Sequence, residues 1–248
     1  NATPVMTKDF SWNAGFNITY NHNKILSLSK VKSDTAVGFA TGGIDGGTGN
    51  TIQINSTGYA INSFYVYKQI YDKNGKPIEG LYEDRNGDGA ITAADKYRYK
   101  SPNPTLYLSF NSNFNYKEWT LGFSLRSNIG NYIYNNQASN FGNYKSFQNA
   151  AFLANMSSSV LKTSFANPQY WSDYYVENGS FVRMDYLNLA YDFGRVWHQK
   201  LGVRVNANVQ NVFVITKYSG QDPEVFSGID NRFYPRPRVY SLGVNLDF

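Results

Sequence analysis

Residues Phe10–Tyr20 read FSWNAGFNITY, in which every even position is apolar or aromatic and every odd position is polar or small. A period of two predicts a β-strand whose two faces meet different surroundings. The segment has about the ten residues that a tilted strand needs to cross a bilayer. This stretch therefore points to a sheet with one face in lipid and the other in water.

Further segments read in the same way, and the count of predicted strands reaches about seven. The six others are Ile25–Val31, Thr105–Tyr116, Trp119–Ile129, Val182–Phe193, Leu201–Ile215 and Arg238–Phe248. Strands of membrane β-barrels alternate in this way, with short periplasmic turns and long extracellular loops.

The connections between these segments fall into two length classes. Short turns are predicted near Asn21–Lys24, at Lys117–Glu118 and around Gly194–Leu201, whereas long loops occupy residues 32–103, 131–179 and 216–237. If the chain ends on the periplasmic side, the strand from Phe10 runs inward and the three long loops face outside. Bacterial single-chain barrels have an even number of strands, so an odd count predicts that this chain is part of a larger barrel.

Composition excludes several other classes of protein. Aromatic residues make up 17% of the chain and charged residues only 17%, against about a quarter in soluble domains. No apolar run approaches the roughly 18 residues of a transmembrane helix. Because cysteine is absent, disulfides and thiolate metal sites are excluded. The net charge of +5 is spread along the chain without a Lys/Arg run, so nucleic-acid binding is not expected.

A soluble β-sandwich is the alternative fold, because its strands also alternate. Sandwich strands are usually only five or six residues long, and their connections do not sort into two classes. Aromatic residues also gather at the ends of the predicted strands, as in the interfacial girdles of membrane barrels, for example at Trp12, Tyr20, Trp119 and Tyr240. The sequence thus favours an all-β fold, a transmembrane antiparallel β-barrel.

Several stretches of the chain resemble the SusC/RagA family of TonB-dependent outer-membrane transporters. They are ENGSFVR at 177–183 with YLNLAY at 186–191, QNVF at 210–213 with TKYSGQDPE at 216–224, YPRPR at 234–238 with LGVNLDF at 242–248, and the loop 84–95 with PNP at 102–104. Their order along the chain agrees with that family. Gln221 departs from it, since an aromatic residue usually precedes Asp222 there.

The resemblance implies a 22-stranded barrel in the outer membrane of a Gram-negative bacterium of the Bacteroidetes, filled by an N-terminal plug. Residues 1–248 would form its C-terminal seven or so strands, with the plug, the TonB box and about fifteen strands outside this chain. The chain starts without a signal sequence, which indicates that a signal was removed or that the chain is a fragment.

The implied function is import of nutrients, oligosaccharides or peptides, with a SusD-like surface lipoprotein as lid and the TonB complex as the source of energy. The sequence leaves the choice between glycan and peptide open. Polar residues on the inner face are expected to line the wall against the plug, namely Asn13, Asn17, Arg126, Asn128, Arg204, Asn206 and Asn208.

A calcium loop is the most explicit chemical motif. Residues 84–95 (DRNGDGAITAAD) place oxygen ligands as an EF-hand loop does: Asp84, Asn86, Asp88, the backbone carbonyl of Ala90, and Asp95 at position twelve. Position twelve is usually Glu, and no helix pattern precedes the loop. The alternative is a glycine-rich turn whose Asp and Asn residues merely tolerate unusual backbone angles. We expect any bound Ca²⁺ to be structural, and no organic cofactor.

Two further sets of aromatic residues have candidate roles. Tyr170, Trp171, Tyr174 and Tyr175 could stack on sugar rings or contact the lid protein, although packing within their own loop is favoured. Phe248 ends the last alternating segment and resembles the C-terminal signal read by the machinery that assembles outer-membrane barrels.

No enzymatic site is expected. His22 and His198 fall in predicted short turns without a nucleophile motif nearby. The glycine-rich run Thr41–Gly49 lacks the Lys of a phosphate loop and reads as a flexible surface loop. Only Ser146–Lys162 could hold a short amphipathic helix. The alternative function is a calcium-stabilised surface adhesin or carbohydrate-binding domain; a barrel hydrolase has no supporting residues.

Overall fold

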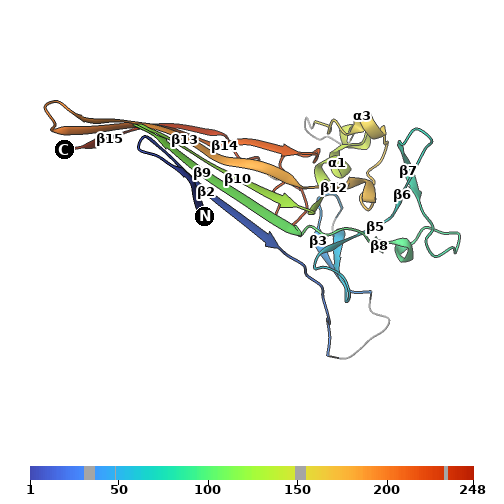
Figure 1. Ribbon diagram of the computed structural model, residues 1–248. Coiled ribbons are helices and arrows are strands. Elements are labelled where there is room, and N and C mark those ends of the chain that lie inside the picture. The colour runs from blue at the N-terminus through green and yellow to red at the C-terminus, as the bar shows by residue number, and fades with distance from the viewer. Residues whose placement is uncertain (31–36, 48, 149–154, 232–233) are drawn as a thin grey trace.

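A computed structural model describes residues 1–30, 37–47, 49–148, 155–231 and 234–248. In these residues six long strands and the short β1 form one antiparallel sheet in the order β1-β2-β9-β10-β13-β14-β15 (Figure 1). Their bounds are β1 (Ala2–Met6), β2 (Phe10–Tyr20), β9 (Leu106–Tyr116), β10 (Trp119–Ile129), β13 (Phe181–Val196), β14 (Leu201–Thr216) and β15 (Val239–Asp247). Each long strand pairs with the next long strand along the chain, so the sheet is an antiparallel meander. No helix in the described residues is long and apolar enough to span a membrane.

Six of the seven predicted strands are confirmed, and the prediction of a strand at Ile25–Val31 is wrong for its described residues, 25–30. There the Ile25 N–H donates to the Tyr59 carbonyl, so this segment pairs with the first long connection and not with the sheet. The seventh strand is β1, which the alternation pattern does not reveal. It is short and contains Pro4 next to a register shift, which is where a sheet tolerates proline.

The predicted direction of the Phe10–Tyr20 strand is also wrong. Phe10 lies opposite Tyr116 and Tyr20 opposite Leu106, so β2 runs antiparallel to β9 and ends where the long connections begin. Residues 21–24 are therefore the start of the first long connection and not a short turn. The short connections are the ones after β1, β9 and β13, and all of them lie at the other end of the sheet.

The two faces of the sheet differ as the alternation predicts. Aromatic side chains of neighbouring strands meet on one face near the short connections, where the Trp12 and Phe114 rings lie 5.7 Å apart and those of Phe114 and Phe123 6.3 Å apart. Phe16 and Leu242 on the same set of positions are well exposed. An exposed apolar face of this kind is what a membrane barrel turns to lipid.

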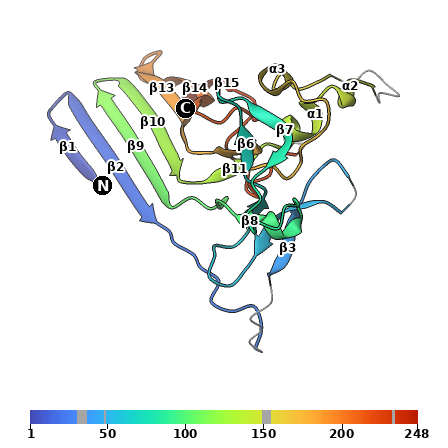
Figure 2. The ribbon, with the colours of Figure 1, turned by 90° about the vertical axis from the view of Figure 1, so that its right-hand side faces the viewer.

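The three long connections contain most of the remaining elements, which gather at one end of the sheet (Figures 1 and 2). The first and longest contains β3 (Phe39–Gly43), β4 (Thr51–Asn55), β5 (Ser63–Val66), β6 (Gln69–Tyr71), β7 (Pro77–Tyr82), η1 (Ala93–Asp95) and β8 (Tyr97–Arg98). The second contains β11 (Tyr132–Tyr134), α1 (Asn136–Phe141), α2 (Lys145–Gln148), α3 (Val160–Thr163), η2 (Asp173–Tyr175) and β12 (Val176–Asn178).

The described residues within 21–105, 130–180 and 217–238, which we call the loop assembly, share one hydrophobic core. All three contribute to it, and its buried members are Ile44, Ile52, Phe64, Val66, Tyr134, Ala138, Phe165, Tyr175, Val176 and Ile229. Hydrogen bonds between connections add to this packing: Gln53 Nε2 donates to the Ser227 carbonyl at 2.8 Å, and Trp171 Nε1 donates to the Thr51 carbonyl at 3.0 Å. The loops therefore pack as one body.

Two sequence predictions about these loops need correction. The run Thr41–Gly49 is not simply a flexible surface loop: Thr41 to Gly43 belong to β3 and Ile44 is buried in the core, while Thr48 lies outside the described residues. The helix expected at Ser146–Lys162 is represented by the short α2 and α3, and residues 149–154 between them are outside the described part.

We expect Leu242→Arg to destabilise the barrel by about 2–4 kcal/mol, the cost of a cation on the lipid face near the bilayer midplane. Leu242 lies at the middle of β15 and is 78% exposed. Unfolding by denaturant of the full-length protein in lipid vesicles measures this cost. Ser241→Arg is the control, because Ser241 faces the opposite side, across from Asn208. Equal effects of the two variants would contradict the assignment of the faces.

Candidate functional site

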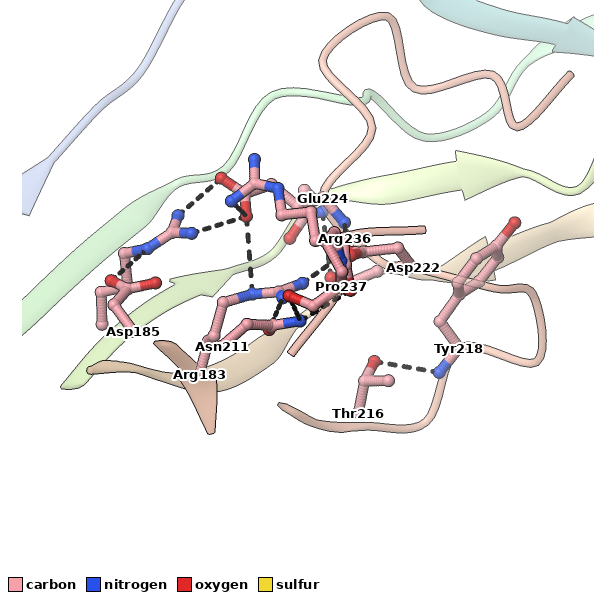
Figure 3. Close-up of polar contacts among 12 residues, drawn as sticks. Arg183, Asp185, Asn211, Thr216, Tyr218, Asp222, Glu224, Arg236 and Pro237 are labelled. Carbon is pink, nitrogen blue, oxygen red and sulfur yellow. Dashed lines mark hydrogen bonds and ion pairs between the residues drawn. The ribbon is translucent and has the colours of Figure 1, made fainter. Parts of the chain in front are cut away.

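A buried arginine joins the sheet to the third long connection (Figure 3). Arg183 on β13 is 1% exposed, and its Nη2 lies 2.6 Å from Asp222 Oδ1 of that connection. Its Nη1 donates to Asn211 Oδ1 on β14 at 2.5 Å. Removing such a charge from water costs several kcal/mol unless it is paired and hydrogen-bonded. Asp222 and Asn211 bind the two Nη atoms, and Arg183 Nε lies 3.6 Å from Glu224 Oε2, so these residues hold the connection against the strand.

A bulge in β14 brings Asn211 to this position. The pairing of β13 with β14 shifts between Met184–Phe213 and Tyr186–Gln210, and Asn211 has a φ of 51°. Asparagine tolerates this left-handed conformation better than most residues. The Asn211 Nδ2 donates to the Arg236 carbonyl at 2.8 Å, so one amide connects Arg183 with the segment that enters β15.

A second arginine completes an ionic network on the same face. Arg126 on β10 binds Glu224 through two parallel hydrogen bonds of 2.6 and 2.7 Å, and its Nε lies 2.6 Å from Asp185 Oδ2. Arg236 Nη1 lies 3.0 Å from Glu224 Oε2. Burial alone would raise the pKa of Glu224, but the hydrogen bonds from Arg126 and the nearby arginine charges outweigh it and hold the pKa below its ordinary value.

The network as a whole fixes Asp222, Glu224 and Arg236 of the third connection to the inner face. Its charges balance, because three arginines face three carboxylates: Arg126, Arg183, Arg236, Asp185, Asp222 and Glu224. Sequence reasoning placed Arg126 on the inner wall but gave the others no role. The usable signal was an arginine inside an apolar strand segment, which needs a buried acid from elsewhere in the chain.

Below this network the inner face carries a row of amides. At one level across the sheet, paired neighbours run through Asn13, Asn113, Gly122, Asn188, Asn208 and Ser241. Gly122 leaves room for its neighbour, since a Cβ there would lie 2.4 Å from Asn113 Oδ1. A hollow of about 510 Å³ opens over part of this row. The structure thus brings Asn13 and Asn208 of the predicted wall into one uncharged, polar surface.

The candidate aromatic residues of the second connection belong to the packing of the loop assembly. Tyr175 is buried in the core, and Tyr170, Trp171 and Tyr174 are half-buried against it. The Trp171 ring also lies 4.4 Å from Lys96 Nζ, a cation–π contact with the first connection. Their positions agree with the packing interpretation; contact with a substrate or lid remains a prediction.

The side-chain oxygens of the Asp84–Asp95 loop accept hydrogen bonds from backbone N–H groups. Asp84 accepts from Gly87 and Gly89, at 2.7 and 2.8 Å. Asp95 is fully buried and accepts from Thr92 and Arg85, which lowers the pKa of its carboxyl group. These bonds close the loop in the manner of Asx turns.

The donor set of this loop is spread out. Within the described ranges, no three His, Cys, Asp or Glu side chains cluster closely enough to hold a metal ion. Asn86 and Asp88 are exposed, with the Asn86 Nδ2 donating to Asp88 Oδ2 at 2.8 Å, whereas Asp95 faces the interior. The turn interpretation accounts for these contacts without a metal. Calcium binding by Asp84, Asn86, Asp88, Ala90 and Asp95 stays a prediction.

The two histidines lie at opposite ends of the sheet. His22 belongs to the first long connection, and His198 to the short connection between β13 and β14, so the expectation that both lie in short turns is wrong for His22. They cannot act in one catalytic site. Phe248 follows the end of β15 and is 91% exposed, and its role in assembly stays a prediction.

Comparison with known proteins decides the family. No family model matches the chain. The TonB-dependent receptor SusC of Bacteroides thetaiotaomicron is 42% identical over 255 aligned positions that cover the whole chain and 25% of that protein. The chain belongs to the SusC/RagA family. TonB-dependent receptor P3 of Formosa agariphila is 27% identical, again over the whole chain and 28% of the relative. The chain thus spans about a quarter of the length of the curated relatives it matches.

The sheet and loop assembly of this SusC-like chain also match solved structures. The RagAB peptide importer in its closed-closed state has a TM-score of 0.73 and 26% identity, over 99% of this chain and 28% of that one. The seven strands are therefore part of a transmembrane antiparallel β-barrel. SusC and P3 are TonB-dependent receptors by name and RagAB is an importer, and none of the three is named as an enzyme.

We expect Asp222→Ala to cost about 3–5 kcal/mol of unfolding free energy, because it removes the nearer acid partner of the buried Arg183 and leaves only Glu224, whose Oε2 lies 3.6 Å from Arg183 Nε. Denaturant unfolding of the full-length protein in detergent measures the loss. Limited proteolysis should also cleave residues 217–238 faster. Asp247→Asn is the matched control: its contact with Arg195 is 3.5 Å long and exposed, so less than about 1 kcal/mol is expected. A loss as small for Asp222→Ala as for the control would contradict the role of the network.

If the Asp84–Asp95 loop binds calcium, Ca²⁺ at about 100 times its Kd should stabilise the protein by about 2.7 kcal/mol. Thermal melts in Ca²⁺ and in EDTA measure this difference, and Asp88→Ala should abolish it. Asp72→Ala is the control, since Asp72 closes a neighbouring turn through the Asn74 and Lys76 amides. It should lower stability without changing the calcium dependence. Unchanged calcium dependence in Asp88→Ala would remove the calcium site.

Proposed function

We propose that this chain is the C-terminal quarter of a TonB-dependent transporter that imports nutrients across the outer membrane. The observation that carries the proposal is 42% identity to SusC along the whole chain, together with a sheet that follows the RagAB importer. The strands form part of the barrel wall. Substrates are oligosaccharides or peptides, the two classes that the resemblance implies.

The connections give this wall an orientation. With the short connections on the periplasmic side, the loop assembly lies at the outer surface of the cell. The apolar face with Phe16 and Leu242 then meets lipid, and the amide row with Asn113 and Asn188 faces the lumen and its plug. Strands β1 and β15 each have one neighbour in the described sheet, and they pair with further strands of the same barrel.

The ionic network has a mechanical role in this proposal. Arg183 and Arg126 attach Asp222 and Glu224 of the third connection to β13 and β10, and Ile229 of that connection reaches into the core of the loop assembly. The loop assembly is thereby fixed to the wall. A rigid outer rim supports docking of a SusD-like surface lipoprotein, while the TonB complex acts through the plug.

Calcium has a supporting role in this proposal. The Asp84–Asp95 loop lies beside the shared core, because Arg85 stacks on the Tyr97 ring at 4.7 Å and Lys96 on Trp171. A Ca²⁺ ion held by Asp84, Asn86 and Asp88 would stiffen the first connection against the second. Phe248 serves in assembly of the barrel.

Uptake by living cells tests the proposed function. Cells that lack the full-length gene receive a defined pool of oligosaccharides or a defined pool of oligopeptides, and depletion from the medium is followed by mass spectrometry. We expect deletion to slow depletion of one of the two pools, since a substrate that crosses only through this barrel has no other efficient route. The restored gene should recover it.

The control separates transport from passive diffusion. In cells without TonB, the restored gene should fail to recover uptake although the protein is present in the outer membrane. Depletion of both pools at the wild-type rate in the deletion strain would overturn the proposed function.

A further inference from the structure

A pocket of about 580 Å³ opens in the loop assembly, and its lining reaches Gln221, which precedes Asp222 of the ionic network. One wall is α1 with Asn135 before it, the second is the segment 155–162 that enters α3, and the third is the turn 219–221. Figures 1 and 2 show α1 and α3 side by side at the loop end of the molecule. Its volume lies in the range of pockets that bind small ligands, about 300–1,000 Å³. We call it the α1 pocket.

The third wall is held rigidly in place. Glu177 accepts hydrogen bonds from Asn135 Nδ2 at 2.9 Å and from the Ser219 N–H and hydroxyl, each at 2.8 Å. Both oxygens of this carboxylate are thus occupied behind the wall. The Asn135 side chain also accepts from the Ala138 N–H and so caps α1. The α1 pocket is therefore pre-formed, which reduces the entropy cost of binding.

Polar groups without partners line this pocket. In the described part of the chain, the side chains of Gln137, Ser158, Lys162 and Gln221 have no hydrogen bond or ion pair. They come from all three walls. Phe141 adds an aromatic surface. Amides, a hydroxyl and one aromatic surface together suit a ligand with many hydroxyl groups and an apolar ring face.

The backbone around the pocket is unsuited to an extended peptide. Each lining residue lies in a helix, a turn or irregular structure, and none in a described strand. Peptides that bind in extended form usually add to an exposed strand edge, which supplies paired N–H and carbonyl groups. The α1 pocket offers side chains instead, and this favours a saccharide.

Charge narrows the class of saccharide. Lys162 is the one ionisable side chain among the lining residues, and the Glu177 carboxylate behind the wall is already bonded. Among the lining side chains, a cationic ligand therefore meets only the like charge of Lys162. An anionic group can pair with Lys162 while hydroxyl groups bond to Gln137 and Gln221.

We propose that the α1 pocket binds a saccharide that carries a carboxylate, with Lys162 pairing with that carboxylate. The proposal rests on the proposed import function and deepens it by naming a substrate class, uronate-containing oligosaccharides. Lys162 determines acidic specificity, and the two glutamines contribute to binding of any sugar that fits. Binding is measured on purified protein, so it can fail while uptake of some nutrient still holds.

Titration by saturation-transfer NMR tests the proposal, using the full-length protein in detergent with glucuronate, glucose or the dipeptide Gly-Glu as probe. We expect glucuronate to bind more tightly than glucose. Lys162→Met should weaken the binding of glucuronate by about three- to fivefold, which corresponds to the loss of an exposed ion pair. The affinity for glucose should not change. The double variant Gln137→Ala/Gln221→Ala should weaken both sugars by about tenfold.

The matched control is Lys145→Met, which removes an exposed cation from α2 outside the pocket lining. This variant should not change the affinity for either sugar. The proposal would be overturned if the protein bound glucuronate and glucose with equal affinity. It would also be overturned if neither pocket variant changed the affinity for glucuronate. Binding of Gly-Glu without binding of glucuronate would also overturn it, in favour of an acidic peptide site.

Discussion

The buried charge of Arg183 is the constraint on which the architecture of this chain depends. A guanidinium group with 1% exposure on a strand of the barrel wall is tolerated only when acids and amides surround it. Asp222, 39 residues further along the chain, supplies the acid, and Asn211 supplies the amide. Both must fold back onto β13, so the third connection cannot extend freely from the wall. The contact thus converts a long loop into a fixed part of the barrel rim.

The other two long connections are also held in place, by packing within the loop assembly. A long connection that stays exposed would leave its backbone polar groups to water and bury little apolar surface. Here, apolar side chains from all three connections close one core, and Trp171 and Gln53 bond across connection boundaries. The result is a second body, made mostly of short strands and turns. Ile229 packs the third connection into the core of this body, and the ionic network joins that connection to the sheet. Its pockets keep their shape because their walls are anchored in different connections.

Two polar surfaces follow from this arrangement, and they differ in chemistry. The inner face of the sheet presents an uncharged amide row, with Asn113 over Gly122 and Asn188 opposite Asn208. Neutral amides can exchange hydrogen bonds with water or with a moving neighbour without holding either tightly. The α1 pocket of the loop assembly instead carries an unpaired lysine and free amides in a rigid frame. Under the proposed function, the first surface suits passage of a substrate and the second suits its binding.

The sequence by itself determined the barrel wall. Alternation in Phe10–Tyr20, Trp119–Ile129 and the last segment depends only on which face of the sheet each side chain takes. Because successive side chains of a strand point to opposite faces, neighbouring residues in the sequence are enough to show this pattern. Six strands were found in this way; β1 was missed because Ala2–Met6 is short and carries a proline. The tertiary structure alone decided the direction of β2, the shared core of the loops, the partners of Arg183 and the α1 pocket. Each of these joins residues tens of positions apart, and no local pattern records a contact whose energy comes from distant segments meeting in space.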